Sequence, residues 1–271
     1  MFLLLFILAP LLKTIRKGLF QLMKDKKIFI TGATSGIGME IAQLCIDEGY
    51  EVHATGRNKT SLKALQDLGA HTYVCDLNQK ESIRSLCQEL PEVDVVILNA
   101  GVGVFKNAYD LSVQEINQMI DINIRAPIYF SHYLAPQMIE NKSGHIIFIG
   151  SQAGKVATKK ASVYAASKHA ITGFANGLRM ELASYNVKVS VVFPGPINTP
   201  FLDKADPTQN YKKTMKSFLL KPETVANKVI RLIEKPKREV NLPRIMSFTS
   251  KLYAVTPSIV EILGKSFFNK K

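Results

Sequence analysis

The stretch Lys27-Ile28-Phe29-Ile30-Thr31-Gly32-Ala33-Thr34-Ser35-Gly36-Ile37-Gly38 decides how this chain folds. Its apolar first half predicts a short buried strand, its second half is a glycine-rich turn, and the residues after the turn predict a helix. At a strand-to-helix turn, backbone N–H groups and the positive end of the helix dipole favour a bound anion such as a pyrophosphate. Glycines at these positions remove the Cβ atoms that would keep phosphates away.

The rest of the chain repeats this strand-to-helix alternation. After Lys27–Thr31, strands are predicted at Glu51–Thr55, His71–Val74, Val93–Leu98, His145–Ile149, Val187–Phe193 and Arg238–Leu242. Helical segments separate them, so the strands are expected to run parallel with right-handed crossovers. The prediction is an α/β fold: a doubly wound, Rossmann-type, parallel seven-stranded sheet in a single domain over residues 23–242, with a cap at about 200–221.

Composition limits the function classes. The 271 residues suit one α/β domain, and three cysteines without metal-like spacing favour a reducing, cytoplasmic location. A formal net charge of +13 favours anionic partners, but no nucleic-acid motif accompanies it. We therefore expect no nucleic-acid partner. The five histidines are scattered, and no metal site is predicted.

The two ends of the chain differ from the central domain. Residues 1–22 are apolar and then basic, which is compatible with a short anchor peripheral to the cytoplasmic face of a membrane; the alternative is a translation start placed too early. Twelve apolar residues are too few to span a bilayer, which takes about 20. Residues 243–271 carry apolar residues at helical spacing. They predict a lid over an apolar substrate, a membrane-surface helix, or a helix packed on the core.

Four polar residues suggest the chemistry. Tyr164 and Lys168 are four apart on a predicted helix and therefore share a face. A nearby ammonium favours the phenolate of a tyrosine, whose ordinary pKa is about 10, so Tyr164 is a candidate acid/base. Ser151 follows a buried strand, where its hydroxyl can stabilise charge on a substrate oxygen. The fourth residue, Asn123, lies at a helix junction, where a helix-kink or capping role is the alternative.

These features together resemble the short-chain dehydrogenase/reductase family over roughly residues 25–242, in the subgroup with TGxxxGxG and YxxxK motifs. The residues that carry the resemblance are Thr31–Gly38, Asp76, Asn99, Ala100, Gly101, Asn123, Ser151, Tyr164, Lys168 and Pro194–Thr199. The resemblance implies hydride transfer between a nicotinamide cofactor and a carbonyl or alcohol. It implies catalytic roles for Asn123, Ser151, Tyr164 and Lys168, with Asn123 holding water in a proton relay through Lys168. Leu98 departs from the family, which often has a second Asn there.

The cofactor contacts follow from the same resemblance. Asp76 and Leu77 are expected at the adenine, Asn99-Ala100-Gly101 beneath the cofactor, and Lys168 at the nicotinamide ribose. The backbone of Ile197 and the hydroxyl of Thr199 are the expected carboxamide contacts. The full predicted cofactor-binding set is Gly32, Thr34, Ser35, Gly36, Ile37, Gly38, Arg57, Asp76, Leu77, Asn99, Ala100, Gly101, Tyr164, Lys168, Pro194, Gly195, Ile197 and Thr199.

The end of the second strand distinguishes the two nicotinamide cofactors. NAD enzymes place a carboxylate there for the ribose hydroxyls, whereas Ala54-Thr55-Gly56-Arg57-Asn58 contains none. Arg57 can instead hold a 2′-phosphate through its planar fork, which predicts a preference for NADP(H) over NAD(H). The alternative is that Arg57 is only a surface residue of the loop.

The leading hypothesis is an NADP(H)-dependent carbonyl reductase or alcohol dehydrogenase acting on an apolar small molecule, as a homodimer or homotetramer. A 3-oxoacyl-carrier-protein reductase is the first alternative, because the basic chain suits an acidic carrier. A non-catalytic NADP-binding regulator is the second, because fold alone does not establish catalysis.

Overall fold

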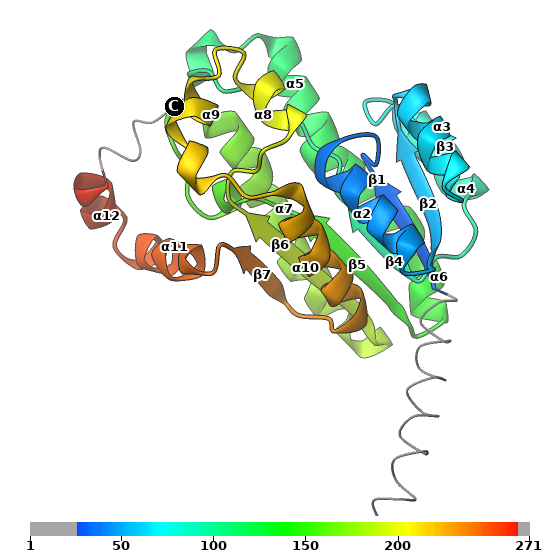
Figure 1. Ribbon diagram of the computed structural model, residues 1–271. Coiled ribbons are helices and arrows are strands. Elements are labelled where there is room, and N and C mark those ends of the chain that lie inside the picture. The colour runs from blue at the N-terminus through cyan, green and yellow to red at the C-terminus, as the bar shows by residue number, and fades with distance from the viewer. Residues whose placement is uncertain (1–25, 265–271) are drawn as a thin grey trace, which may run out of the picture.

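A computed structural model describes residues 26–264 as a parallel seven-stranded sheet between two layers of helices (Figure 1). The strand order is β3-β2-β1-β4-β5-β6-β7, and every neighbouring pair is parallel. This confirms the predicted doubly wound Rossmann-type fold. The strands are β1 (Lys27–Thr31), β2 (Glu51–Gly56), β3 (His71–Val74), β4 (Val95–Leu98), β5 (Gly144–Ile149), β6 (Val187–Pro194) and β7 (Glu239–Leu242).

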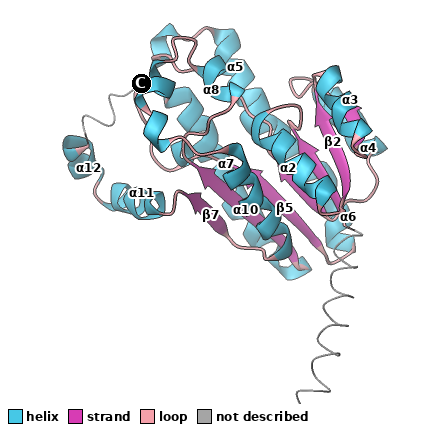
Figure 2. Cartoon of the chain, viewed as in Figure 1, coloured by secondary structure: helices cyan, strands magenta, loops and turns pink. Residues whose placement is uncertain are grey.

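The helices cover both faces of the sheet (Figure 2). The α-helices are α2 (Gly36–Asp47), α3 (Lys59–Asp67), α4 (Lys80–Glu89), α5 (Val113–Ile120), α6 (Ala126–Glu140), α7 (Ser162–Leu182), α8 (Pro200–Ala205), α9 (Asn210–Thr214), α10 (Pro222–Glu234), α11 (Ile245–Val255) and α12 (Pro257–Leu263). The 3-10 segments are η1 (Ala108–Asp110), η3 (Gln152–Gly154), η4 (Ala183–Tyr185) and η5 (Lys216–Phe218), and η2 (Asp121–Arg125) is a π-helix.

The central strands supply two cores because successive side chains of a strand point to opposite faces. Ile28 and Ile30 of β1 are buried against residues of α2 and α10, whereas Phe29 between them is buried against residues of α4, α6 and α7. The strands in the middle of the sheet are apolar along their whole length, as expected for a sheet covered on both faces.

The crossover from β1 to β4 positions the site. The chain leaves β1 toward β2 on one side and later returns to β4 on the other, so β1 and β4 are neighbours whose following segments diverge. In open parallel sheets, ligands bind at this switch point, in the crevice beyond the carboxyl ends of the strands. The glycine turn follows β1 and Asn99 follows β4, so both lie at this crevice.

The segment after β7 is an arm formed by α11 and α12, which extends beyond the edge of the sheet (Figure 1, orange to red). Its apolar residues Phe248, Leu252, Val255, Ile259 and Ile262 are exposed. Of the three alternatives predicted for this segment, packing on the core is therefore not found for these side chains. No helix among residues 26–264 is long and apolar enough to cross a membrane. The predicted anchor at 1–22 lies outside the described residues.

Candidate active site

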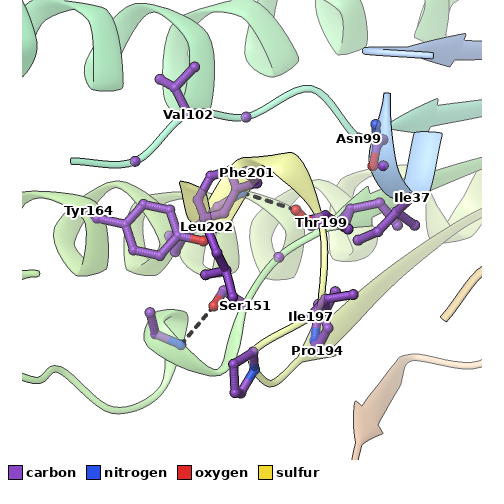
Figure 3. Close-up of a pocket in the computed structure, with 18 of the residues that line it drawn as sticks. Ile37, Asn99, Val102, Ser151, Tyr164, Pro194, Ile197, Thr199, Phe201 and Leu202 are labelled. Carbon is purple, nitrogen blue, oxygen red and sulfur yellow. Dashed lines mark hydrogen bonds between the residues drawn. The ribbon is translucent and has the colours of Figure 1, made fainter. Parts of the chain in front are cut away.

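A cavity of about 910 Å³ lies at the switch point, and nearly all predicted site residues line it. Figure 3 shows Ile37 and Asn99 at one side of this cavity and Tyr164 at the other, with Thr199 and Phe201 between them. Two predicted residues, Gly38 and Asn123, are absent from the lining. The predicted residues that do line it are Gly32, Thr34, Ser35, Gly36, Ile37, Arg57, Asp76, Leu77, Asn99, Ala100, Gly101, Ser151, Tyr164, Lys168, Pro194, Gly195, Ile197 and Thr199.

The glycines of the turn are required for two different physical reasons. Gly32 and Gly36 adopt φ angles of +67° and +55°, a region that other residues rarely occupy. Gly38 instead permits close packing, because a Cβ there would lie 2.3 Å from both the Asn99 side-chain nitrogen and the Gly32 carbonyl oxygen. The missing Cβ of Gly38 therefore makes room for the protein's own turn, and a contact of Gly38 with the cofactor stays a prediction.

Asn99 fixes the turn to the end of β4. Its side-chain amide donates to the carbonyl oxygens of Thr31 (3.0 Å) and Gly32 (3.1 Å). The Thr31 hydroxyl in turn accepts from the backbone N–H groups of Asn99 and Ala100, each at 3.1 Å. The turn is therefore held rigidly beside Asn99-Ala100-Gly101, which is a positioning role that the sequence did not reveal.

The residues at this end fit an anionic dinucleotide. Helix α2 points its N-terminus into the cavity through Ser35, Gly36 and Ile37, and the Ser35 hydroxyl caps no backbone N–H group. The Arg57 guanidinium also lines the cavity and is exposed, with no hydrogen bond or ion pair to any residue in 26–264. A helix N-terminus with unmatched donors and a free guanidinium match the phosphates of such a cofactor.

The chemical residues come from helix α7 and from the end of strand β5, which meet at the other end of the cavity. Tyr164 and Lys168 lie on α7, one turn apart, and the Lys168 nitrogen is 5.9 Å from the centre of the Tyr164 ring. The Lys168 ammonium donates to the carbonyl oxygen of Ile149, at the end of β5, over 3.1 Å. Ser151 follows β5 and hydrogen-bonds Tyr164. The strand ends and one helix face thus bring the predicted polar groups together.

Burial changes the proton affinities of this pair. It lowers the pKa of Lys168 to about 8, because a charged ammonium is poorly solvated there. It raises the pKa of Tyr164 to about 12, and the hydrogen bond with Ser151 opposes that rise. The sequence predicted a lowered pKa for Tyr164, and this lowering is not found in the protein without its cofactor. Desolvation outweighs the hydrogen bond with Ser151, so Tyr164 is a protonated hydroxyl at neutral pH.

Asn123 lies in the π-helix η2, between α5 and α6. Its side-chain oxygen accepts from the backbone N–H of Val102, and its amide donates to the Val102 carbonyl and the Ser167 hydroxyl, all within 2.9 Å. The side chain thus fastens the loop after β4 to α7, and a π turn in a helix often marks a functional position. A Cβ built on Gly101 would lie 3.4 Å from both the Asn123 oxygen and the Lys168 nitrogen, so these two polar groups face the same backbone.

Aromatic side chains enclose the space around Tyr164. The centres of the Phe105 and Phe201 rings lie 5.9 and 5.7 Å from that of Tyr164, and Tyr211 lies 5.3 Å from Phe105. Phe105 and α8 are joined by the main chain, since the Phe105 N–H donates to the Ala205 carbonyl over 2.8 Å. The predicted cap therefore lies over Tyr164 and gives this end of the cavity an apolar wall.

The arm contributes Ile245, Met246 and Tyr253 to the cavity lining, and a lid over the substrate was one of the three alternatives predicted for this segment. One part of the site was missed from the sequence. Gln152, next to Ser151, donates to the Phe193 carbonyl (2.8 Å) and to Asn241 of β7 (3.2 Å). The polar side chain of Gln152, directly after Ser151, was the feature of the sequence that could have indicated this role. Away from the cavity, Glu51, His53 and His71 gather within 4.8 Å of one another on β2 and β3.

Comparison with known proteins agrees with this geometry. Residues 26–210 match the family model of the short chain dehydrogenases. An uncharacterized oxidoreductase of Staphylococcus aureus (strain MRSA252) is 35% identical over 231 residues, which cover 82% of this chain and 96% of the relative.

Solved structures give the same result. The closed form of a serine dehydrogenase complexed with NADP+ is 30% identical, with a TM-score of 0.73 over 80% of this chain and 94% of that one. A metagenomic short-chain oxidoreductase in complex with NADP is 28% identical, with a TM-score of 0.67 over 80% of this chain and 96% of that one. The chain therefore belongs to the short-chain dehydrogenase family and is an oxidoreductase.

Proposed function

We propose that this protein interconverts a carbonyl group and an alcohol on an apolar small molecule, with NADP(H) as its cofactor and Tyr164 as the acid/base. The observation that carries the proposal is that Tyr164, Ser151 and Lys168 line the same cavity as the glycine turn and the free Arg57 guanidinium. A phosphate-binding end and a proton-transfer end thus belong to one continuous space. When bound, the cofactor supplies or accepts the hydride.

The protein's residues account for the proton. In carbonyl reduction, the Tyr164 hydroxyl donates its proton to the substrate oxygen as the carbonyl carbon gains the hydride, and the alcohol results. Its raised pKa keeps Tyr164 protonated beforehand. Ser151 hydrogen-bonds the same oxygen and stabilises the charge that develops on it. Lys168 stabilises the phenolate that remains, and Asn123 holds the water that returns the proton through Lys168.

The preference for NADP(H) rests on Arg57. It follows β2 on the cavity wall, and the segment around it has no carboxylate to receive ribose hydroxyls. Two similar proteins support the same choice, since the serine dehydrogenase and the metagenomic enzyme were each solved in complex with that cofactor. Asp76, at the adenine end, accepts from the Asn78 backbone (3.1 Å) and side chain (2.8 Å), which holds its carboxylate in place.

The apolar substrate rests on the cavity wall. Phe105, Phe201 and Tyr211 surround Tyr164, and the lining continues through Met215 to Met246. Removing a carbonyl compound with a large apolar group from water and burying it among such side chains is favourable. A small polar carbonyl gains little there. The substrate we propose is therefore an apolar ketone or aldehyde.

The test is NADPH consumption by the purified protein with a series of ketones and aldehydes of increasing apolar size, alongside Tyr164→Phe. We expect turnover to rise with apolar size and to fall by about a hundredfold or more in the variant, because acid/base catalysis contributes about that much. NADPH binding, measured by fluorescence titration, should persist in Tyr164→Phe. Turnover that survives in the variant, or a preference for small polar carbonyls, contradicts the proposal.

A further inference from the structure

Helix α11 presents apolar residues on two faces. Met246, Thr249 and Tyr253, which are three and four residues apart, line the cavity. Phe248, Leu252 and Val255 have the same spacing, but they lie outside the lining and are exposed. An amphipathic helix of a soluble domain has one apolar face, directed at the core. A second apolar face needs a second apolar environment.

This outward face continues along α12. Its exposed fractions run from 46% at Leu252 to 82% at Leu263, and Ile259 and Ile262 lie between these limits. Exposed apolar residues that gather in this way, rather than scatter singly, mark interaction sites. We call the set Phe248, Leu252, Val255, Ile259, Ile262 and Leu263 the outer face of the arm.

The outer face joins the mouth of the cavity. Ile245 at the start of α11 and Phe218 on the cap both line the cavity, yet they are 65% and 55% exposed. Exposed apolar residues of the arm and of the cap therefore also belong to the lining of the cavity that contains Tyr164. In Figure 1 the arm extends from the β7 edge on the same side of the molecule as α8 and α9.

The charges around this mouth identify the partner. Residues 210–221 and 243–264 contain six basic residues and one acidic residue. Lys212 is paired with Asp203, and the acidic residue, Glu261, accepts a hydrogen bond from Tyr253. The other basic residues, Lys213, Lys216, Lys221, Arg244 and Lys251, are exposed. An apolar face with basic residues around it matches a membrane surface that carries anionic lipid.

A second copy of the chain fits this surface less well. In a two-fold symmetric contact, each patch meets its own copy, so the basic residues of one arm would face the same basic residues of the other. Like charges brought together in this way oppose association. An anionic lipid surface instead neutralises them.

We propose that α11 and α12 form a lipid-docking arm: the outer face inserts among the headgroups of an anionic membrane, and the cavity mouth opens onto the lipid. The docking proposal depends only on the residues of the arm and not on the proposed function. A second step, which rests on the proposed function, is that the apolar carbonyl substrate enters the cavity from the membrane.

The chain offers a direct test because it contains no tryptophan. In Phe248→Trp, the single indole reports the environment of the outer face, whatever residues 1–25 do. We expect its emission to move to shorter wavelength with vesicles of phosphatidylcholine and phosphatidylglycerol, and to be quenched when the acyl chains are brominated. The matched control is Met180→Trp, on the exposed side of α7 far from the arm in sequence, whose emission should not change.

A charge variant and an activity measurement complete the design. Arg244→Ser/Lys251→Ser should weaken vesicle binding roughly 20-fold, because each basic residue near an anionic surface contributes about fivefold. The docking proposal is overturned if vesicles leave the emission of Phe248→Trp unchanged. It is also overturned if the protein forms dimers through the arm and does not bind vesicles. Reduction of a water-soluble carbonyl distinguishes the two proposals. If Phe248→Trp reports insertion and no carbonyl is reduced in solution or in vesicles, the docking stands and the proposed function fails.

Discussion

The Lys168 ammonium donates its hydrogen bond to the carbonyl oxygen of Ile149, 3.1 Å away, and not to a carboxylate. No ion pair compensates this charge among residues 26–264, and its side chain is buried. Burying an ammonium without an ion-pair partner destabilises the folded state, because the charge is no longer solvated by water. The pKa of Lys168 therefore falls to about 8. The fold thus holds a destabilising charge at the position where the proposed chemistry needs one.

Replacing this lysine should therefore change how stability depends on pH. Between pH 8 and 10.5 the unfolded chain keeps a proton on Lys168 that the folded chain has released, so the free energy of unfolding rises with pH in this window. Below pH 8 both states are charged, and the full cost of burial applies. In Lys168→Met this dependence is absent.

Urea denaturation at pH 7 and pH 10 measures the difference. The free energy of unfolding of the wild type, relative to Lys168→Met, should increase by roughly 3 kcal/mol between these two pH values. Lys63→Met, at an exposed position of α3, is the control and should follow the wild type. Parallel pH profiles for wild type and Lys168→Met would show that the buried amine does not titrate in this range.

Arg57→Ala should separate the two nicotinamide cofactors. Loss of charge-assisted hydrogen bonds to a 2′-phosphate should weaken NADPH binding by roughly 10- to 100-fold, while NADH binding stays as it was. Titration of both cofactors by fluorescence gives the ratio. Arg84→Ala removes an exposed arginine of α4 outside the cavity and should change neither constant. Equal losses for NADPH and NADH would place Arg57 elsewhere than at the 2′-phosphate.

Two glycine-to-alanine changes should have opposite effects on stability. Gly38→Ala forces a methyl group to within 2.3 Å of the Asn99 amide and the Gly32 carbonyl, so it should lower the free energy of unfolding by about 1–3 kcal/mol. At Gly173→Ala, inside α7, the new methyl group meets nothing within 4 Å apart from the neighbouring backbone of its own helix, so the change should raise the free energy of unfolding by about 0.5–1 kcal/mol. Thermal unfolding of both variants measures the contrast, and a stable Gly38→Ala would show that the turn can move away from Asn99.

Phe201→Ala should weaken apolar substrates through KM. The ring lies against Tyr164 and Gly103 and is partly buried, so it supplies part of the about 1.5–3 kcal/mol of a fully buried phenylalanine, and KM should rise roughly tenfold. The value of kcat should change little, since the ring contacts substrate before and during the reaction alike. Tyr109→Ala, which removes an exposed aromatic residue outside the cavity, is the control. An unchanged KM for apolar ketones would exclude Phe201 from the substrate wall.

Much of the fold was predictable because its causes are local. The alternation of apolar runs with helical periodicity gave every strand of the sheet, and β2, β3, β5 and β6 differ from their predicted bounds by one residue or less. The glycine turn was predictable for the same reason, since the backbone at Gly32 and Gly36 needs glycine whatever lies around it. The polar residues at the strand ends then converge because the strands are parallel.

The remainder depends on contacts between distant segments. The reason for Gly38 lies in Asn99, sixty-one residues away, and no local pattern reveals such a contact. The direction of the Tyr164 pKa shift depends on how deeply α7 is covered, which four-residue spacing does not specify. The arm carries helical periodicity on both faces, so periodicity predicted its helices but not which face meets the cavity.

The π turn at Asp121–Arg125 limits how this family member can be lengthened or shortened. One additional residue in this turn rotates everything after it by about 100° relative to what precedes it. Asn123 reaches Val102 and Ser167 only with that rotation in place. A deletion here would give a more regular helix and would detach the loop after β4 from α7. At this turn, a regular α-helix and the contacts that Asn123 makes in the site therefore exclude each other.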